Sequence, residues 1–538
     1  MDTPRPRPLT DWLLLTGFCA FLFFFGIAHF GLVGADEPRY AQVAREMLAR
    51  HDLITPTLGG KPWLEKPVLY YWQAMLAFGI FGVSDWAARL PSAIDATLMV
   101  VAVYLFLKRF RSGIELDGAL MTASSAGIIG FARAASMDMA LAAAFTIAML
   151  AWYAWHQTSS RRCLTLFYLF VGLSGLAKGP VGPFLAAAII VIFAMAKAEY
   201  RLVGRTLWIP GILLFCAVTL PWYVAVQLRN PEFFRVFILE HNLARFGTNL
   251  YRHPEPFWYY LPVMLIGLVP WTVFVIAALV ESMRTWWIER CGFLQTEDAF
   301  NAFLVIWLVV PVVFFSISQS KLPGYILPAL PAGTLLLADY VRRHIMANQG
   351  PAMGWAVLHS VTAALPVIPA LLIQYVVFQH RLPWGSAAEV ALALAAILAI
   401  GLIATLRSQY GFRMLRFVTL VPVVLVVAAA LRIGAPALDS TLSVRPVFDQ
   451  ISRLQSRPLP LAVCLVSRDT EYGLAFYANQ AIDRYELGQV PSGEHLVVAL
   501  QGAEKAIAKR AAGRRVSYLG SFAPQHLDYF WVSAESGN

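Results

Sequence analysis

Long apolar runs separated by short polar breaks constrain this chain more than any other feature. Runs of about 16 to 25 residues, the length that crosses a bilayer as a helix, recur up to residue 433. A soluble core could not bury this much apolar surface, because 59% of the residues are hydrophobic and only 14% are charged. Soluble domains carry about 25% charged residues. The sequence therefore predicts a mainly α-helical, polytopic membrane protein with about thirteen transmembrane helices. The runs lie at residues 12–34, 90–107, 116–132, 138–156, 163–178, 180–197, 207–227, 257–280, 300–319, 323–341, 354–378, 387–406 and 414–433.

Basic residues in every second break predict the orientation. Positive charge marks the cytoplasmic side of short loops, which places the N-terminus, with Arg5 and Arg7, inside the cell. The other basic breaks lie at residues 108–111, 161–162, 197–205, 284–290, 342–343 and 407–416. The net charge of +10 suits contact with anionic lipid, and the scatter of the basic residues argues against nucleic-acid binding. We expect the first apolar run to be retained, because it is longer than a signal-peptide core.

Two outward loops are long, at residues 35–89 and 228–256. In the first, Tyr40, Val43 and Met47 share one face at helical spacing, which predicts an amphipathic helix at the membrane interface. A second helical segment follows in "WLEKPVLYYWQAML". Residues 1–433 are thus expected to form one transmembrane domain that carries both loops.

The composition changes after residue 434. The stretches "LAVCLVS" (461–467), "HLVVAL" (495–500), "RVSYLGSF" (515–522) and "LDYFWVSA" (527–534) predict strands, with "TEYGLAFYAN" and "AEKAIAKRAA" as helices between them. Residues 434–538 are therefore expected to form a small outward α/β domain of a size that can fold alone.

Charged side chains gather on the predicted outer rim. A charge at the bilayer centre costs about 2.5–3.5 kcal/mol on insertion scales, and charges near the ends of spans still need partners. The rim group comprises Asp36, Glu37, Arg39, Tyr40, Glu65, Lys66, Arg133, Asp138, Lys178, Glu240, His241, Arg245, Arg252, His253 and Lys321. Aromatic residues accompany it, namely Trp63, Tyr70, Tyr71, Trp72, Trp258, Tyr259, Tyr260 and Tyr325. This one-sided distribution predicts an active or binding site at the outer face.

Simpler structural roles compete with this prediction at each position. Asp36 could cap the loop helix, and Lys66 and Arg39 could reach lipid phosphate only by snorkelling. Arg133 and Asp138 could form a structural ion pair. These roles would all have to hold on one face at once, which favours a functional site.

Several motifs of this rim resemble a known family. These are "GADEPRYAQVAREML", "LEKPVLYYW", "ARAASMD", "LAKGPVG", "EHNLARF" followed by "YRHPEPFWYYL", and "SQSKLPGYILPALP". In this order they resemble the polyprenyl-phosphate-dependent membrane glycosyltransferases of the GT-C superfamily. The closest resemblance is to the bacterial lipid A aminoarabinose transferases, which are related to the protein O-mannosyltransferases. The resemblance spans residues 12 to near 435, and no signature is recognised in the C-terminal domain.

The resemblance implies a multi-pass protein of the bacterial inner membrane with a periplasmic active site and C-terminal domain. It implies transfer of 4-amino-4-deoxy-L-arabinose from undecaprenyl phosphate to lipid A phosphate, which gives resistance to polymyxin and cationic peptides. Membrane lipids are the other expected partners, nucleic acid is not, and a monomer is expected.

The chemistry of that transfer suggests roles for the rim residues. Lys66 and Arg39 are expected to stabilise the departing phosphate, and Asp36 to stabilise positive charge on the sugar or act as a base. Asp138 is expected to support them with Arg133. The predicted substrate-binding residues are Glu37, Tyr40, Glu65, Tyr70, Tyr71, Arg133, Lys178, Arg245, Arg252, Lys321 and Tyr325. No cofactor is required, although Glu65 and His241 could hold a divalent ion.

Two alternatives stay open. A related enzyme could transfer another sugar from a polyprenyl phosphate to protein or lipid. A transporter or flippase is the alternative of another class, but transporters place polar groups near the midplane and use inverted repeats. Here the charges lie on one rim and no paired halves are evident.

Overall fold

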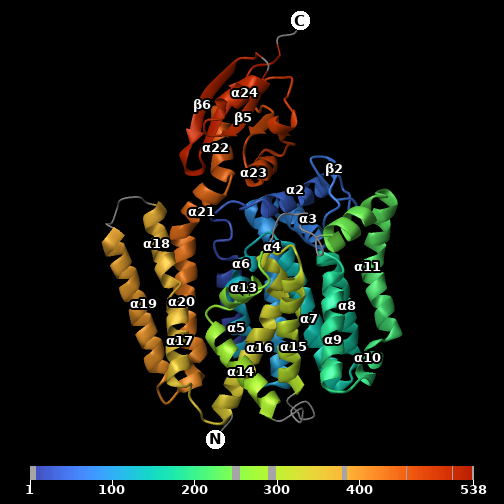
Figure 1. Ribbon diagram of the computed structural model, residues 1–538, viewed down its shortest axis with the longest axis vertical. Helices are drawn as coiled ribbons and strands as arrows, with labels where there is room; N and C mark the ends of the chain where they lie inside the picture. The colour runs from blue at the N-terminus through green and yellow to red at the C-terminus, as the bar shows by residue number, and fades with distance from the viewer. Residues whose placement is uncertain are drawn as a thin grey trace. The chain divides into compact units, whose positions relative to one another are not determined.

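The computed structural model describes residues 8–244, 255–288, 299–377, 384–455, 457–511 and 513–535. Two compact units divide the chain. The first comprises Met1–Phe25, Leu64–Tyr70 and Leu90–Ala430, and the second comprises Gly26–Trp63, Tyr71–Arg89 and Leu431–Asn538. The predicted class, mainly helical with a small C-terminal sheet, is confirmed (Figure 1).

Apolar helices occupy most of the predicted spans, but the first, predicted at 12–34, is helical only to Phe24. They and the shorter helices beside them are α1 (Pro8–Cys19), η1 (Ala20–Phe24), α4 (Asp85–Phe110), α5 (Glu115–Ala123), α6 (Ala126–Ala132), α7 (Met137–Thr158), α8 (Arg161–Lys178), α9 (Val181–Ala196), α10 (Arg201–Thr206), α11 (Ile209–Arg229), η2 (Phe234–Ala244), α13 (Tyr260–Gly267), α14 (Thr272–Ile288), α15 (Ala299–Ile317), η4 (Pro323–Ala329), α16 (Leu330–Met346), α17 (Met353–Ala364), α18 (Val367–Val377), α19 (Trp384–Leu406), η5 (Gly411–Met414), α20 (Leu415–Ala429) and η6 (Ala430–Gly434).

Length and composition identify fewer complete spans than the sequence predicts. Within the described ranges, 8 helices are long and apolar enough to cross a membrane, or up to 9 if the pair α13 and α14, bent by 115°, is one span. Shorter apolar helices lie at Leu9–Phe24, Leu69–Phe81 and Val181–Ala196. The number thirteen therefore stays a prediction.

More than one predicted span is broken. The span 257–280 bends between α13 and α14, and the span 116–132 is interrupted between α5 and α6. Residues 116–132 were expected as a single helix, but α5 ends at Ala123 and α6 begins at Ala126. The hydroxyls of Ser124 and Ser125 donate to the carbonyls of Leu120 and Met121. Hydrogen bonds from side chains to the backbone compete with the helical backbone pattern. Hydropathy does not report such bonds and therefore did not indicate the break.

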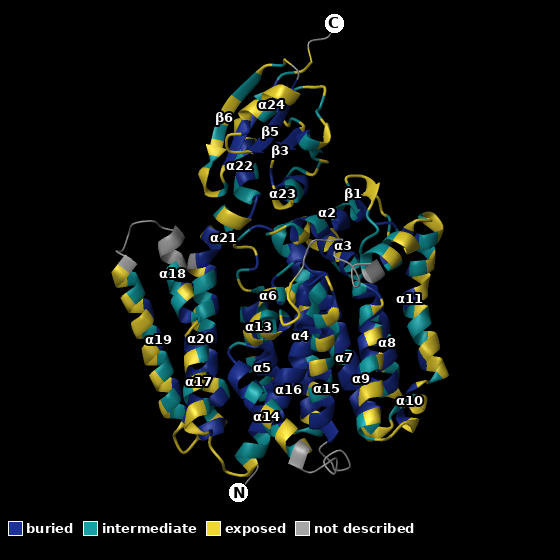
Figure 2. Cartoon of the chain, viewed as in Figure 1, coloured by how far each residue is buried: buried dark blue, intermediate teal, exposed yellow. Residues whose placement is uncertain are grey.

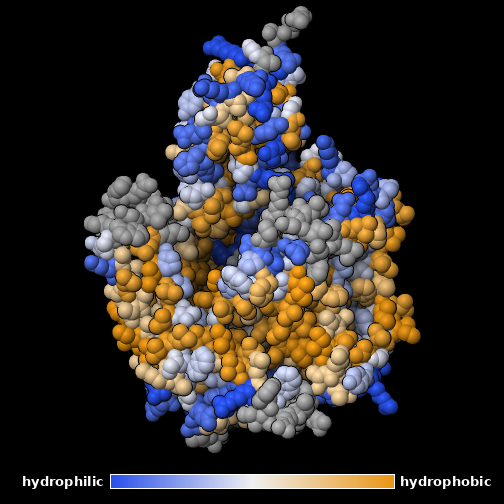
Figure 3. Space-filling model, in the orientation of Figure 1, coloured by the Kyte–Doolittle hydropathy of each residue, from blue (hydrophilic) through white to orange (hydrophobic). Residues whose placement is uncertain are grey.

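Burial separates inner from outer helices in the first unit. In the most apolar 18-residue stretch of α7, 89% is buried, whereas in the corresponding stretch of α19 only 17% is buried (Figure 2). Most exposed side chains of α11 and α19 are nevertheless apolar, for example Leu213, Leu228 and Ile397, and hydrophobic residues cover much of the visible surface of the helical part (Figure 3). Exposed apolar faces of this extent are stable in lipid and not in water.

The second unit contains the loop helix and the small sheet. Its elements, with α3 at its border, are α2 (Asp36–Ala49), β1 (Thr57–Leu58), β2 (Lys61–Pro62), α3 (Leu69–Phe81), α21 (Ala435–Leu442), α22 (Arg445–Leu454), β3 (Leu461–Cys464), α23 (Arg468–Ala478), β4 (Asp483–Arg484), η7 (Tyr485–Leu487), β5 (His495–Leu500), α24 (Glu504–Arg510), β6 (Val516–Phe522), η8 (Ala523–Gln525) and β7 (Leu527–Val532). The predicted strands and the two helices between them are confirmed, while α21 and α22 were not predicted.

The sheet has the order β4-β3-β5-β7-β6. Strand β3 runs parallel to β4 and β5, and β7 runs antiparallel to β5 and β6. One face packs Val463 and Val498 against Leu474 of α23, and the other packs Val497 and Phe530 against Ile507 of α24. Strands β3 and β5, which are parallel to each other, are buried on both faces, as is typical of parallel strands. Independent folding of residues 434–538 stays a prediction, since the compact unit also includes residues 26–63 and 71–89.

Candidate active site

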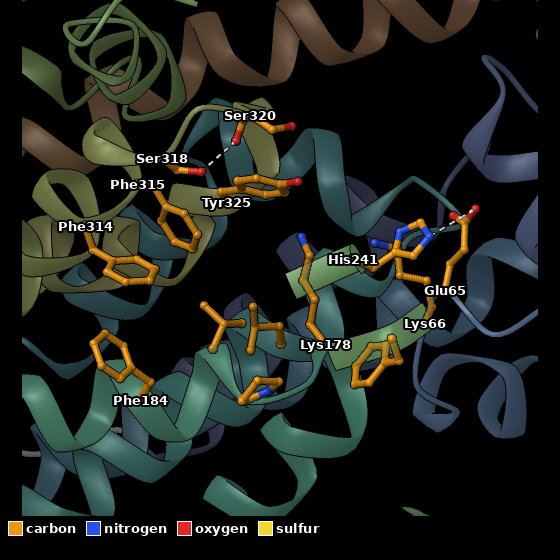
Figure 4. A pocket seen from close by; sticks show the side chains of 14 residues that line it. Glu65, Lys66, Lys178, Phe184, His241, Phe314, Phe315, Ser318, Ser320 and Tyr325 are labelled. Atoms are coloured by element: carbon orange, nitrogen blue, oxygen red, sulfur yellow. Dashed lines mark hydrogen bonds and ion pairs between the residues drawn. The ribbon is translucent and has the colours of Figure 1, made fainter. Parts of the chain in front are cut away.

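A cavity of about 370 Å³ lies within the first unit and contains several of the predicted residues (Figure 4). It is lined by Glu65, Lys66, Leu141, Lys178, Pro180, Val181, Phe184, Phe237, His241, Phe314, Phe315, Ser318, Ser320 and Tyr325. Glu65, Lys66 and His241 gather at one end, and Phe184 and Phe314 at the other. The cavity is therefore charged at one end and apolar at the opposite end.

The ends of two helices bring a lysine and an aspartate together. Helix α7 begins after Ser136, whose hydroxyl accepts from the backbone N–H of Asp138 at 3.1 Å. Helix α8 ends at Lys178, because Gly179 has a φ of 85° and a ψ of −155°, a conformation that favours glycine. The Lys178 ammonium forms an ion pair with the Asp138 carboxylate, and its Nζ lies 4.4 Å from the centre of the Tyr325 ring. Lys178 is thus fixed from two sides.

Gly324 packs directly against this ion pair. A Cβ atom at Gly324 would lie 2.6 Å from Cγ of Asp138 and 2.8 Å from its Oδ1. Glycine is therefore required for η4 to approach the carboxylate. Sequence reasoning had singled out the surrounding motif but missed this residue, because a glycine between prolines also fits an ordinary turn.

Asp138 has a partner that the sequence did not indicate. Asp138 forms its ion pair with Lys178, whereas the Arg133 guanidinium donates to the carbonyl of Leu22 at 3.1 Å. The two residues of "RAASMD" are close in sequence, but the turn that starts α7 directs them to different neighbours. Arg133 thus holds the end of the first span and does not line the cavity.

Glu65 and His241 lie beside each other at the charged end of the cavity (Figure 4). The Glu65 Oε1 and His241 Nε2 atoms are 3.7 Å apart. Zinc sites in proteins use three or four ligands from side chains. No group of three or more His, Cys, Asp or Glu residues suited to a metal ion occurs in the part of the chain that the structure describes. The predicted pair of ligands is brought together, but no third ligand joins it among the described residues.

Three other predicted substrate residues do not line this cavity. Lys321 is buried, and its ammonium donates to the carbonyls of Ser318 at 2.6 Å and Glu255 at 3.0 Å. It therefore fixes its own loop. Tyr70 and Tyr71 are fully buried. Arg245 and Arg252, and with them His253, lie outside the described residues.

Helix α2 carries the remaining candidates, in the second unit. Asp36 is in its first turn and pairs with Arg39, while Ala35 occupies the N-cap position. The capping role considered for Asp36 is therefore wrong. The Arg39 guanidinium lies 5.1 Å from the ring of Tyr40, and the rings of Trp63 and Tyr472 lie within 5.3 and 5.5 Å of it. The convergence of Asp36 with Lys66, which belongs to the first unit, stays a prediction.

Glu37 pairs with an arginine that sequence reasoning missed. The Glu37 Oε2 accepts from Nη2 of Arg89 at 2.6 Å, and Arg89 is fully buried. The only signal in the sequence was a charge directly before the predicted apolar run at 90–107. Such a charge usually marks the end of a span, so it did not indicate a buried pair.

Comparisons with known proteins agree with this architecture. Residues 12–237 match the family model described as dolichyl-phosphate-mannose-protein mannosyltransferase. A relative from Edwardsiella ictaluri (strain 93-146), named undecaprenyl phosphate-alpha-4-amino-4-deoxy-L-arabinose arabinosyl transferase, is 32% identical over 356 residues, 65% of this chain and 61% of the relative. The protein of the same name from Pseudomonas aeruginosa (strain UCBPP-PA14) is 31% identical over 68% of this chain and 65% of its own length. The matches thus span less than two thirds of these relatives.

Solved structures support the fold. The crystal structure of ArnT from Cupriavidus metallidurans bound to undecaprenyl phosphate superimposes with a TM-score of 0.74 and 20% sequence identity, covering 97% of this chain and 98% of that one. The apo structure of the same protein gives the same TM-score at 21% identity. The resemblance of this sequence to the polyprenyl-phosphate glycosyltransferases of the GT-C superfamily, and among them to ArnT, is confirmed.

Proposed function

We propose that this protein transfers 4-amino-4-deoxy-L-arabinose from undecaprenyl phosphate to a phosphate of lipid A. The observation that carries the proposal is the cavity, which has Lys66 at one end, Lys178 between the two ends, and Phe184 and Phe314 at the other end. A lipid phosphate needs this combination, because its head is anionic and its chain is apolar. The names of the relatives and the undecaprenyl phosphate bound to ArnT support this choice of sugar and carrier.

The proposed reaction transfers one glycosyl group from the carrier phosphate to the acceptor phosphate. The bond between C1 of the sugar and the carrier phosphate oxygen breaks, and the electron pair leaves with that oxygen. An oxygen of the lipid A phosphate forms the new bond to C1. The carrier changes from a phosphodiester to a phosphate monoester and gains negative charge, so cations that bind this charge more strongly in the transition state accelerate departure.

Lys66 and Lys178 are proposed to contact the carrier phosphate. Both line the cavity, and Lys178 is held in one position by Asp138 and Tyr325. Asp138 then acts as a positioning residue. A preorganised cation is more effective than a free one, because it needs no rearrangement as charge develops.

Asp36 and Arg39 are proposed to serve the sugar and the acceptor. A sugar that loses its leaving group takes on oxocarbenium character, which a carboxylate stabilises. Asp36 is half exposed and already lies beside a guanidinium, so it is available to substrate. An ionised phosphate acceptor carries no proton that must be removed, and a strong general base is therefore not needed.

The proposed location is the periplasmic face of the bacterial inner membrane, with the N-terminus in the cytoplasm and the protein acting as a monomer. We propose no metal requirement, because the lysines supply the positive charge. Under this proposal, transfer continues in the presence of EDTA. A divalent ion held by Glu65 and His241 would instead make transfer sensitive to the chelator.

The test is a reconstituted transfer assay with the purified protein, the undecaprenyl-linked aminosugar and lipid A. Mass spectrometry of lipid A should show the gain of one aminopentose. Lys66→Ala and Asp36→Ala should each abolish the gain while the protein remains folded and inserted. Lys61→Ala, which removes an exposed lysine of β2, is the matched control and should retain activity. Normal transfer by both test variants would refute the assigned roles.

A second candidate is transfer to a protein hydroxyl, which the family model over residues 12–237 favours. A serine or threonine acceptor must lose a proton, so this reaction would need a general base. Glycosylated peptide together with unmodified lipid A would establish this candidate. Movement of lipid without transfer to either acceptor would instead indicate a transporter.

A further inference from the structure

A short irregular segment between the first span and α2 has an unusual set of hydrogen-bond partners. This connecting segment, residues 27–33, has no helix and only one isolated bridge, between Val33 and Ser443. Buried or partly buried backbone groups outside regular structure need partners from side chains or water. Here two arginines that are far apart in the sequence provide them.

Five consecutive carbonyls of the connecting segment accept from arginine side chains. Arg89 donates to the carbonyls of residue 27 at 3.0 Å, residue 30 at 2.8 Å and residue 31 at 2.8 Å. Arg445 donates to the carbonyls of residue 28 at 3.3 Å and residue 29 at 3.2 Å. Every carbonyl from Ile27 to Gly31 thus accepts from an arginine, with the bonds to residues 28 and 29 exposed at the surface, so the path of the chain is fixed residue by residue.

Carboxylates and a tyrosine hold the amide groups of the same segment. The Gly31 N–H donates to Asp439 at 2.7 Å, the Leu32 N–H to the Tyr477 hydroxyl at 2.8 Å, and the Val33 N–H to Glu37 at 2.8 Å. Carboxylates, two of which also accept from these amides, neutralise the positive charges of the arginines. Arg89 pairs with Glu37, and Arg445 pairs with Asp439 at 2.8 Å and with Asp85 at 2.9 Å.

Gly31 lies at the centre of this network and tolerates no side chain. A Cβ atom there would lie 2.2 Å from the Ser443 hydroxyl oxygen and 2.5 Å from the Tyr477 hydroxyl oxygen. Both residues come from the C-terminal part of the chain. The C-terminal part of the chain therefore packs directly against the connecting segment at Gly31.

Helix α2 begins directly after the connecting segment. Glu37 is in its first turn, next to Asp36 and two residues before Arg39. From the other side, α2 packs on α23, where Arg45 donates to the carbonyl of Phe476 at 2.9 Å and the Tyr472 ring covers Arg39. A displacement of the connecting segment would therefore displace the candidate catalytic residues of α2.

We propose that Arg89 and Arg445 are positioning residues for the transfer reaction, which act by holding the connecting segment and thereby α2. The proposal rests on the proposed function for its activity readout. It assigns the C-terminal domain a part in the geometry of the site through Arg445, Asp439 and Tyr477. A misplacement of about 1 Å costs about a hundredfold in rate when the geometry of reacting groups is fixed by the protein.

The experiment compares Arg445→Gln and Arg445→Lys with Arg457→Gln in the full-length protein. Arg457 is a matched control, because it is an exposed arginine of the same domain that pairs with Glu494. Arg445→Gln should lower kcat about a hundredfold with KM for the lipid-linked donor nearly unchanged, since the lysines of the cavity are intact. Arg445→Lys should recover part of kcat, and Arg457→Gln should match the parent protein.

Hydrogen–deuterium exchange of residues 31–40 supplies a readout besides activity. Exchange in this stretch should become faster in Arg445→Gln and in the milder variant Tyr477→Phe, and should stay slow in Arg457→Gln. Unchanged kcat and unchanged exchange in Arg445→Gln would overturn the proposal. If the parent protein transfers no sugar, the proposed function fails, and the exchange experiment still decides whether the arginines hold the segment.

Discussion

Single residues set the chemistry of the cavity, and Gly324 is the clearest case. Its missing Cβ lets η4 reach the Asp138 carboxylate. We predict that Gly324→Ala displaces Asp138 from Lys178 and lowers transfer about a hundredfold, because the proposed phosphate contact depends on a fixed lysine. The reconstituted assay measures this effect.

The matched control is Gly401→Ala in α19, where a Cβ atom would meet nothing within 4 Å. Alanine has a higher helix propensity than glycine, so this variant should be as stable and as active as the parent protein. Equal activity of Gly324→Ala and Gly401→Ala would contradict the role given to Gly324.

A buried histidine makes the C-terminal domain sensitive to acid. His495 is fully buried in β5, where its Nδ1 donates to the Gly493 carbonyl and its Nε2 contacts the Tyr485 hydroxyl at 2.6 Å. Burial lowers the pKa of His495 and raises the pKa of Tyr485 to about 12. The tyrosine therefore remains a donor and the imidazole remains neutral.

The consequence for stability follows from the direction of that shift. An unfolded histidine has a pKa of about 6.5, so below this pH the unfolded chain binds a proton that folded His495 resists. Stability is present above this value and is lost as the pH falls below it. The thermal unfolding temperature should decrease when the pH is lowered from about 7.5 to about 5.5. This decrease should be smaller in His495→Gln. Equal falls would contradict the prediction.

At the scale of elements, the end of α8 decides where Lys178 lies. The helix stops because Gly179 adopts backbone angles that a residue with a Cβ rarely takes. We predict that Gly179→Ala costs about 1–3 kcal/mol of stability and moves Lys178 away from Asp138. Sugar transfer by Gly179→Ala should decrease by more than the decrease in the amount of folded protein explains.

Two measurements separate these effects. Thermal unfolding reports the cost to the fold, and transfer per folded molecule reports the place of Lys178. Gly204→Ala in α10, where the added Cβ atom would meet nothing within 4 Å, serves as the control. Full activity per folded molecule in Gly179→Ala would show that the end of α8 does not position the lysine.

At the scale of the whole molecule, the basic breaks predict which side of the membrane each part faces. Ser408 lies exposed in the basic break between α19 and α20, and Ser492 lies exposed before β5. In intact cells, a membrane-impermeant maleimide should label Ser492→Cys and should not label Ser408→Cys. After the cells are opened, both should react. The parent chain, with its own cysteines, gives the background.

The opposite labelling pattern would reverse the predicted orientation. It would also remove the periplasmic site from the proposed function, because lipid A phosphate and the lipid-linked sugar would then meet the cavity from the wrong side. Labelling of both positions in intact cells would instead indicate that the break between α19 and α20 is accessible from outside.

Helix and strand positions could be predicted well because they depend on local properties. Run length and hydropathy are read from neighbouring residues, and they located α7, α15 and α20 nearly to their ends. Alternation of apolar residues located β5 and β7 in the same way. The break between α5 and α6 was not predicted, because it depends on two serine hydroxyls. Their effect is lost when hydropathy is averaged over a whole span.

The sequence by itself determined that this chain is a membrane protein, where its helices and strands lie, and that charges gather in a few motifs. Only the tertiary structure decided the partners of those charges. Asp138 meets Lys178 across 40 residues of sequence, and Arg445 meets the carbonyl of residue 28 across 417. Such pairs depend on how helices and loops pack, because a side chain reaches only a few ångströms while the chain between partners can follow many paths.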